Sequence, residues 1–326
     1  MSALPNSPRR ALRAVLSVAA VAMLAGCGAD AAVPRSDPVP PVNPLPPKAR
    51  EITNPTAPDS GCDAEASLRP GPRSGALPPD SALARIMAKG RVTVGVDQNT
   101  YLFGFRNPAT GQLEGFDIDL AREIARELFG DANRIELRSL STAERVPALQ
   151  HKQVDLVART FSVTCERRRD VDFSSVYYRA AQRILAPRTS GIRGLSDLSG
   201  KRVCVTFGSN SSRPLFTLPT RPTVLGVDNW TDCLVALQQG QVDAISTDES
   251  ILIGLAEQDR NLQVVGDGLG FENYAVGVPK GEADLVRFVN GVLDRLRADG
   301  TWERLYAMHL DALGPSPGAP APRYTG

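Results

Sequence analysis

Histidine is scarce in this chain, with 2 residues among 326, and none of the 5 cysteines stands close to another in the sequence. Because cysteine and histidine are the usual protein ligands of zinc, this composition argues against a zinc site. An excess of one charge is also lacking, since 37 lysines and arginines face 36 acidic residues. The charge balance therefore gives no electrostatic reason to expect a nucleic-acid partner.

Motifs of the common enzyme classes are missing as well. The chain shows no Ser-His-Asp pattern, no Gly-x-Ser-x-Gly motif and no phosphate-binding loop. An enzyme would need a general acid in its cleft. The acidic candidates, Asp97 and Asp248, are better explained as polar groups that hold a bound molecule. We therefore expect neither catalysis, nor a cofactor, nor a metal ion.

The N-terminus carries an export signal. Three arginines within the first 13 residues precede an apolar run over residues 14–24, which is too short to span a bilayer and is typical of a secretory signal. The run ends in Leu-Ala-Gly-Cys27, a sequence typical of a bacterial lipobox. We expect residues 1–26 to be removed and Cys27 to be lipidated, which would anchor the chain to the outer face of a membrane. A plain signal peptide with a chance cysteine is the alternative.

Proline is concentrated in the segment that follows. Thirteen of the 26 prolines lie between Pro34 and Pro79, with almost no apolar periodicity. Such a segment cannot bury a core, so residues 27–81 are predicted to form an extended, semi-rigid tether. Residues 314–326 are also rich in Pro, Gly and Ala and are predicted to be disordered.

Four cysteines remain after the lipidated one: Cys62, Cys165, Cys204 and Cys233. An even number in an exported chain indicates two disulfides, for which three connectivities exist. We favour Cys204–Cys233, because Cys204 lies in a predicted strand and Cys233 in a nearby predicted helix. The remaining pair would attach the end of the tether beside the central loop of the body.

From Arg91 onward, strand-like and helix-like patterns alternate, which is typical of an α/β fold with mainly parallel sheets. A buried strand over residues 154–158 leads into a polar loop over residues 160–164 and then into a helix that has arginine in its first turn. A second strand-loop-helix series begins at residues 203–207. Two such series indicate two α/β lobes with a cleft between them.

Several motifs, taken in order, resemble those of a known family. They include Gly115-Phe-Asp-Ile-Asp-Leu120, Val154-Asp-Leu156, Ser162-Val-Thr-Cys-Glu-Arg167, Asp172-Phe-Ser174, Val242-Asp-Ala244 and Gly300-Thr-Trp-Glu-Arg-Leu-Tyr306. Over about residues 91–313 the chain resembles the extracytoplasmic solute-binding proteins, family 3, of polar amino-acid ABC transporters. Within that family it is most similar to the actinobacterial glutamate/glutamine-binding lipoproteins.

The resemblance implies a two-lobed, type II periplasmic-binding fold in which two hinge strands join the lobes. The hinges would lie near Ile184-Leu185 and Val276-Gly277. Lobe 1 would comprise residues 82–184 and 278–313, and lobe 2 residues 185–277. Open α/β sheets bind ligands beyond the carboxyl ends of their strands, and the lobes would close around the ligand by a hinge motion.

An amino-acid ligand needs hydrogen-bond donors for its α-carboxylate. Arg167 is the expected anchor, because its planar guanidinium matches a carboxylate and because the resemblance assigns it this role. Backbone N–H groups of Ser162 and of Ser209 or Asn210 would add one donor from each lobe. The alternative is that Arg167 is a surface helix arginine.

The α-ammonium group needs acceptors. The resemblance assigns this role to Asp248, at the end of a strand in lobe 2. The Thr160 carbonyl and the Ser162 hydroxyl would complete this half of the site. The alternative for Asp248 is an N-cap of the following helix, and both roles can coexist.

Side-chain specificity depends on the groups that meet the far end of the ligand. Arg145 occupies a position at which family members that bind acidic side chains place an arginine, and a buried, unpaired arginine favours a carboxylate over an amide. An exposed Arg145 paired with Glu144 is the alternative. Asp97 would oppose an acidic ligand unless it pairs with an arginine such as Arg106 or Arg145. Phe103 packs either on the ligand or in the core.

Together these assignments predict a monomeric binding protein for glutamate or aspartate, with their amides second, that delivers its ligand to an ABC transporter permease. Presentation of the ligand to a membrane sensor is an alternative that the lipid anchor, tether and cleft fit equally well. An enzyme on the same fold, of the prephenate or arogenate dehydratase type, is the other alternative.

Overall fold

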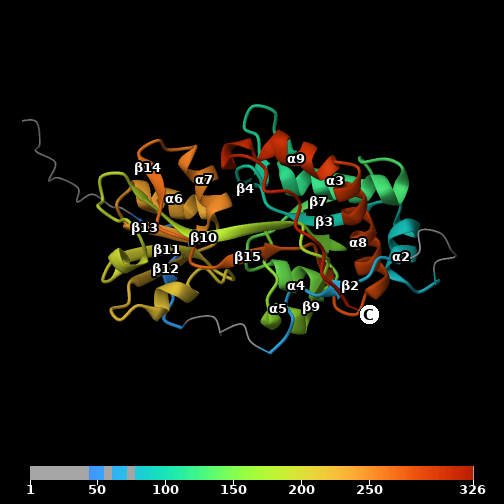
Figure 1. The fold of residues 1–326 in the computed structure, drawn as a ribbon, viewed down its shortest axis with the longest axis horizontal. Helices are drawn as coiled ribbons and strands as arrows, with labels where there is room; N and C mark the ends of the chain where they lie inside the picture. The colour runs from blue at the N-terminus through green and yellow to red at the C-terminus, as the bar shows by residue number, and fades with distance from the viewer. Residues whose placement is uncertain (1–43, 55–60, 72–77, 326) are drawn as a thin grey trace, which may run out of the picture. The chain divides into compact units, whose positions relative to one another are not determined.

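The computed structural model describes residues 44–54, 61–71 and 78–325 (Figure 1). The expected signal peptide and Cys27 lie outside the described residues. Residues from Leu45 onward group into a single unit. None of the helices in the described ranges is long and apolar enough to cross a membrane.

Lobe 1 is built on a sheet with the strand order β7-β3-β8-β16-β9. Strand β3 runs parallel to β7 and β8, whereas β16 runs antiparallel to β8 and β9. The strands are β3 (Val92–Val96), β7 (Ile135–Ser139), β8 (Leu156–Val157), β9 (Val171–Phe173) and β16 (Gly277–Pro279). A small sheet follows β3 and contains β4 (Asn99–Thr100), β5 (Gly104–Arg106) and β6 (Leu113–Glu114).

The helices of lobe 1 are α2 (Ala82–Lys89), α3 (Phe116–Phe129), α4 (Arg145–Gln150), α5 (Cys165–Asp170), α8 (Ala283–Ala298) and α9 (Thr301–His309), with a 3-10 turn η3 (Asp311–Leu313). Helix α3 begins at Phe116, one residue before Asp117. The N-cap is Gly115, at φ 128°, where a Cβ atom would lie 2.4 Å from the Phe103 carbonyl oxygen. Only glycine fits this position.

Lobe 2 is built on the sheet β1-β12-β11-β13-β10-β14, with β15 paired to β10. Strand β11 runs parallel to both β12 and β13. The strands are β1 (Arg50–Glu51), β10 (Tyr178–Pro187), β11 (Arg202–Thr206), β12 (Thr223–Val227), β13 (Ala244–Asp248), β14 (Leu262–Val265) and β15 (Phe271–Tyr274). The helical segments are α6 (Trp230–Gln238), α7 (Glu249–Ala256), η1 (Leu195–Leu198) and η2 (Arg213–Thr217).

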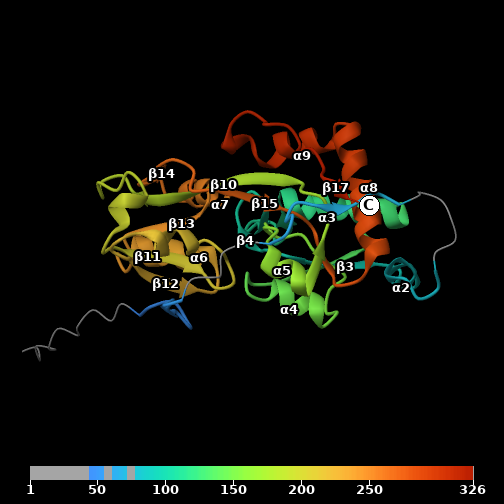
Figure 2. The ribbon, with the colours of Figure 1, turned by 60° about the horizontal axis from the view of Figure 1, so that its bottom comes forward.

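Two strand segments run between the lobes (Figure 2). Strand β10 pairs with β15 over Tyr178–Ala181 and enters the sheet of lobe 2 from Gln182 onward. The second connection leads from β15 into β16, which belongs to the sheet of lobe 1. Strand β10 thus joins lobe 2 two residues before the expected hinge at Ile184-Leu185. The boundaries between the lobes near these two crossings stay a prediction.

The N-terminal segment contacts both lobes. Strand β1 pairs antiparallel with β12 at the edge of lobe 2, and the Ile52 N–H donates to the Val224 carbonyl at 2.8 Å. Residues 61–71 lie on lobe 1, where the Ser67 hydroxyl donates to the Phe173 carbonyl at 2.9 Å. The expectation that residues 27–81 form only an extended tether is therefore wrong for the described residues 45–54 and 61–71, because backbone pairing and side-chain bonds hold them on the lobes.

The two disulfides connect the predicted cysteines. Cys204–Cys233 joins β11 to α6 within lobe 2, and Cys62–Cys165 joins the N-terminal segment to α5 of lobe 1. The second bond reaches the helix that carries Arg167.

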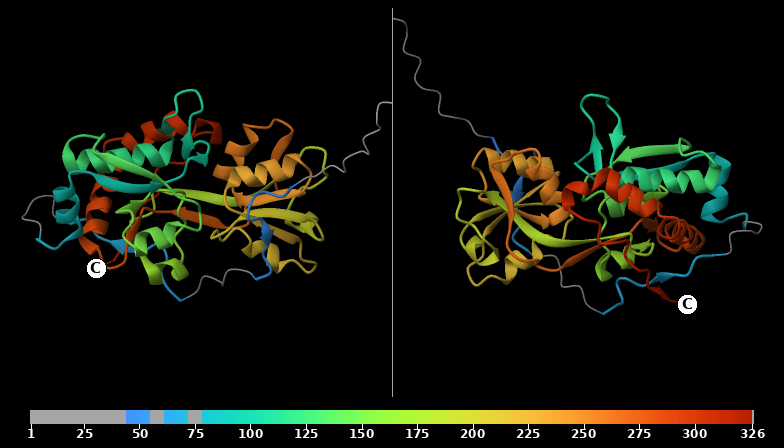
Figure 3. Two further views of the ribbon diagram at one scale, coloured as in Figure 1. Left: turned by 180° about the vertical axis from the view of Figure 1, so that it is seen from behind. Right: turned by 45° about the horizontal axis from the view of Figure 1, so that its top comes forward.

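The C-terminal tail follows the surface of lobe 1 rather than being disordered as expected (Figure 3). Strand β17 (Tyr324–Thr325) pairs in parallel with β2 (Ser67–Leu68). The Arg297 guanidinium donates to the Pro320 carbonyl at 3.0 Å, and the Tyr324 hydroxyl donates to Asp294 at 2.7 Å. A proline-rich segment cannot form its own core, but its carbonyl groups accept bonds from an existing surface.

Candidate functional site

The loop after β8 and helix α5 place Arg167 at the cleft. Helix α5 begins at Cys165 because the Thr164 side chain caps it and accepts a bond from the Arg167 N–H at 3.1 Å. The half-buried Arg167 guanidinium donates to the Ser162 carbonyl at 2.6 Å and to the Gly208 carbonyl at 2.8 Å. Gly208 follows β11 in lobe 2, so Arg167 bridges the two lobes.

Arg145, the first residue of α4, lies beside Arg167. Its side chain is buried, with 3% exposed, and its guanidinium donates to the carbonyls of Thr142, Thr160 and Gly208 at 2.9, 3.1 and 3.3 Å. The guanidinium carbons of Arg145 and Arg167 lie 4.5 and 5.2 Å from the centre of the Phe161 ring. The ring thus supports both cations through cation–π contact. Phe161 and Gly208 were not among the predicted site residues.

Within the described ranges Arg145 forms no ion pair, although the negative charges of Asp248 and Asp97 act on it from farther away. Among the described residues, the hydrogen-bond partners of the Arg145 guanidinium are carbonyl oxygens. Glu144 instead accepts a bond from the Ser141 N–H at 2.6 Å, so the alternative of an exposed Arg145–Glu144 pair is wrong. Burial, together with repulsion from Arg167, holds the pKa of Arg145 well below its usual range. An anionic group would stabilise the charged guanidinium here.

A cavity of about 180 Å³ lies against these arginines and has walls from both lobes. Lobe 1 contributes Arg145, Arg167 and the Phe161 ring, and lobe 2 contributes Ser209 and Asn210. The lobes also touch beside the cavity, where the hydroxyl oxygens of Thr206 and Thr142 lie 3.4 Å apart. Of the residues predicted to bind the ligand's α-carboxylate, the structure thus brings Arg167, Ser209 and Asn210 together, whereas Ser162 does not line the cavity.

Asp248 ends β13 and is buried, with 6% exposed. Its carboxylate accepts a hydrogen bond from the Tyr274 hydroxyl, and it makes no side-chain cap bond to α7. The N-cap alternative is thus not realised through the side chain. Burial, followed by repulsion from Glu272, raises the pKa of Asp248 to about 8. A cationic partner would stabilise the ionised form of this carboxyl group.

Thr160 adopts a strained backbone conformation, with φ at 38°, which is rare for a β-branched residue. Its N–H donates to the Asp117 carboxylate at 2.8 Å, and Asp117 also accepts from the Tyr177 hydroxyl at 2.6 Å. The Thr160 carbonyl, expected to bind the ligand's ammonium group, accepts from Arg145, and the Ser162 carbonyl accepts from Arg167. The loop thus holds both arginines through its carbonyl groups.

Ser209 and Asn210 lie in the loop after β11. Both the N–H and the hydroxyl of Ser209 donate to the Thr206 carbonyl, at 3.3 and 2.8 Å, so the expected Ser209 donor is directed into its own loop. The Asn210 amide donates to both carboxylate oxygens of Glu272, at 2.8 and 2.9 Å. Glu272 was not predicted, because a single acidic residue on a strand carries no signal in the sequence.

Asp97 forms a buried ion pair with Arg159, at 2.8 Å, rather than with Arg106 or Arg145. Nothing in the sequence identified Arg159 as the partner of Asp97, apart from its position after an apolar strand. Phe103 is fully buried and packs against the rings of Phe116 and Tyr178, so it belongs to the hydrophobic core and does not line the candidate cavity.

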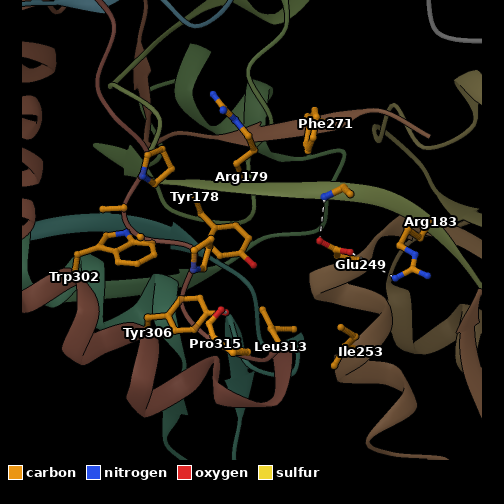
Figure 4. Close-up of a pocket in the computed structure, with 15 residues that line it drawn as sticks. Tyr178, Arg179, Arg183, Glu249, Ile253, Phe271, Trp302, Tyr306, Leu313 and Pro315 are labelled. Atoms are coloured by element: carbon orange, nitrogen blue, oxygen red, sulfur yellow. Dashed lines mark hydrogen bonds and ion pairs between the residues drawn. The ribbon is translucent and has the colours of Figure 1, made fainter. Parts of the chain in front are cut away.

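A larger hollow, of about 530 Å³, lies beside β10 (Figure 4). It is lined by Trp302 and Tyr306 of α9, by the proline-rich tail and by α7. Its charged side chains are paired, since Arg183 lies 3.8 Å from Glu249 and Arg179 lies 3.0 Å from Glu65. The arginine pair that suits a carboxylate lies in the smaller cavity, which we therefore take as the candidate ligand site.

Residues 92–312 match the family described as bacterial extracellular solute-binding proteins, family 3. The chain belongs to this family. The ABC transporter glutamine-binding protein of Bacillus subtilis is 35% identical over 225 residues, which cover 69% of this chain and 82% of that protein. The glutamate-binding protein of Corynebacterium glutamicum is 31% identical over 243 residues, covering 71% and 82%.

Solved structures give the same fold. The solute receptor for L-cysteine of Neisseria gonorrhoeae is 28% identical, with a TM-score of 0.69 over 72% of this chain and 97% of that one. An ancestral arginine-binding protein bound to glutamine is 33% identical, with a TM-score of 0.63 over 68% and 98%. The chain is thus a two-lobed solute-binding protein, and its relatives are binding proteins of ABC transporters rather than enzymes.

Proposed function

We propose that this solute-binding protein binds a polar amino acid, with glutamate or aspartate bound more tightly than glutamine or asparagine, and delivers it to an ABC transporter permease. The named relatives, which bind glutamine and glutamate, support a polar amino acid as the ligand. The acidic preference rests on one observation: the buried Arg145 guanidinium borders the cavity with carbonyl oxygens as its described hydrogen-bond partners.

The proposed roles follow from charge. Arg167 would bind the α-carboxylate and Arg145 the distal carboxylate, because a charge-assisted bond is stronger than a bond to a neutral carbonyl. Asp248 would bind the α-ammonium group. We also propose that Cys27 carries a lipid anchor and that the monomeric protein works on the outer face of the cell membrane.

Calorimetry on the exported chain with Cys27→Ser tests the ligand preference. Unliganded protein, stripped by partial unfolding and refolding, is titrated with glutamate and glutamine, and then with aspartate and asparagine. We expect glutamate to bind about ten- to a hundredfold more tightly than glutamine, and Arg145→Gln to abolish the difference. Arg91→Gln is the matched control, because Arg91 is exposed and pairs with Glu136. Tighter binding of glutamine by the unaltered protein would overturn the acidic preference.

A further inference from the structure

Asp97 and Arg159 form an ion pair that is almost fully removed from solvent. The Arg159 Nη2 and Asp97 Oδ2 atoms lie 2.8 Å apart, with 1% and 3% of the two side chains exposed. Asp97 also accepts bonds from the backbone N–H groups of Gln98 and Asn99, at 2.7 and 3.0 Å. These contacts fix the carboxylate, and the ion pair balances its charge.

Arg159 is linked to Arg145 at two points. Its Nη1 donates to the Thr142 hydroxyl at 2.9 Å, and the Thr142 carbonyl accepts from Arg145 Nε at 2.9 Å. The Arg159 carbonyl itself accepts from Arg145 Nη1 at 3.3 Å. Thr142 also lines the cavity. Arg159 therefore contacts Thr142, which holds Arg145, and also holds Arg145 through its own carbonyl, without lining the cavity itself.

The charge of the pair matters because removal of one partner leaves an uncompensated buried charge. Without Arg159, the charge of the Asp97 carboxylate would act on Arg145 with nothing to offset it, and would repel a second carboxylate brought by the ligand. With Arg159 present, its positive charge offsets that of Asp97, and Arg145 forms no ion pair of its own among the described residues. An acidic ligand side chain suits this arrangement better than an amide.

We infer that Arg159 is a positioning residue that sets the preference for an acidic over an amide side chain, by neutralising Asp97 and by holding Arg145 through Thr142. This inference rests on the proposed function of the same site. It assigns the preference to an ion pair that does not line the cavity.

The test is the ratio of glutamine to glutamate dissociation constants, measured by calorimetry on the exported chain with Cys27→Ser. Arg159→Gln should lower this ratio by about tenfold or more, through weaker glutamate binding, while glutamine affinity changes by less than about threefold. Asp97→Asn, which leaves Arg159 without its carboxylate, should raise the ratio severalfold. The double variant should return the ratio to within about threefold of the unaltered protein, because the pair's charges are again balanced.

Opposite shifts from two partners of one ion pair separate a charge effect from general damage to the site. Equal losses for both ligands in Arg159→Gln, or no shift in Asp97→Asn, would overturn the inference. Arg159→Lys keeps the charge and should keep the preference, so it serves if Arg159→Gln does not fold. Arg202→Gln is the matched control, because Arg202 forms an exposed pair with Asp243 and should leave the ratio unchanged.

Failure of the proposed function would look different. If the unaltered protein bound glutamine more tightly, the acidic preference would be lost, yet the two single variants would still have to shift the ratio in opposite directions for the inference to stand. If the unaltered protein preferred glutamate and neither variant shifted the ratio, the proposed function would stand and the inference would fall.

Discussion

Arg145 and Arg167 lie on different helices yet donate to the same atom, the carbonyl oxygen of Gly208, with Nη2–O distances of 3.3 and 2.8 Å. The arginines belong to lobe 1 and Gly208 to lobe 2, so this oxygen joins the lobes at the candidate site. A neutral carbonyl is a weaker partner for a guanidinium than a carboxylate is. Ligand carboxylates would therefore compete for these donors.

Gly208 itself gives the first prediction. At φ 74° it lies in the left-handed region, and a Cβ atom there would lie 2.7 Å from the Ala143 Cα atom of lobe 1. We expect Gly208→Ala to hold the lobes apart and to raise the dissociation constant for glutamate by about tenfold or more. Calorimetry measures the affinity, and small-angle scattering with saturating ligand reports whether the lobes still close.

Gly240→Ala is the matched control for this variant. Gly240 has a similar φ of 68°, but a Cβ atom there would meet no atom within 4 Å. Both variants carry the backbone strain of a left-handed alanine, and one of them adds the clash between lobes. Equal affinities of the two variants would show that Gly208 does not limit closure.

The pH dependence of binding gives the second prediction. Burial, followed by the charge of Glu272, raises the pKa of Asp248 to about 8. Because the ligand's ammonium group needs an ionised carboxylate, binding should release a proton below this pH. Affinity should thus rise with pH from about 5 to about 8, by up to about tenfold per unit, and then level off.

Calorimetry at pH about 6.5, in two buffers of different ionisation enthalpy, counts the protons released. We expect close to one proton, and none in Asp248→Asn. The same raised pKa acts on folding with a defined sign: an acid that binds its proton more tightly in the folded state makes the unliganded protein less stable as pH rises from about 4 to about 8. Proton release that persists in Asp248→Asn would mean that another carboxyl group receives the ammonium group.

The disulfides give the third prediction, because they differ in what they join. Cys62–Cys165 closes a separation of 103 residues and ends two residues before Arg167, whereas Cys204–Cys233 closes 29 residues within lobe 2. Loss of either bond should reduce stability by about 3–5 kcal/mol in the chain-entropy account. Only the Cys62→Ser/Cys165→Ser variant should also weaken glutamate binding, since it frees the start of α5. Thermal unfolding and calorimetry on both double-serine variants measure the two effects, and equal losses of affinity would contradict this assignment.

Much of the fold followed from the sequence because it rests on local patterns. The alternation of strands and helices from Arg91, the two lobes and the position of Arg167 beside the cavity between them are consequences of periodicity and motif order. The pairing of Cys204 with Cys233 was predicted for the same reason, since a strand and a nearby helix of one α/β unit lie close together.

The features that the sequence did not reveal depend on contacts between distant residues. The partner of Asp97 is Arg159, 62 positions away, and the salt bridge between them exists only once β3 and the loop after β8 lie side by side. The order of the tail depends on Asp294 and Arg297, which composition alone does not connect to it. Proline content predicts that a segment cannot fold by itself, but does not predict that it stays unbound.

The tail gives the last prediction. Its backbone pairs with β2 through the Ser67 N–H and the Arg323 carbonyl, at 2.9 Å, and side chains of α8 hold it at Pro320 and Tyr324. At about 1 kcal/mol per net hydrogen bond, deletion of residues 315–326 should lower the free energy of unfolding by about 2–4 kcal/mol. Urea unfolding measures this change.

Arg323→Gln is the control, because its ion pair with Asp63 is exposed and contributes at most about 1 kcal/mol. Glutamate affinity should stay within about twofold in both variants, since the tail's bonds are to lobe 1 elements away from the arginine pair. An unchanged urea midpoint after the deletion would show that the tail does not bind the lobe in solution.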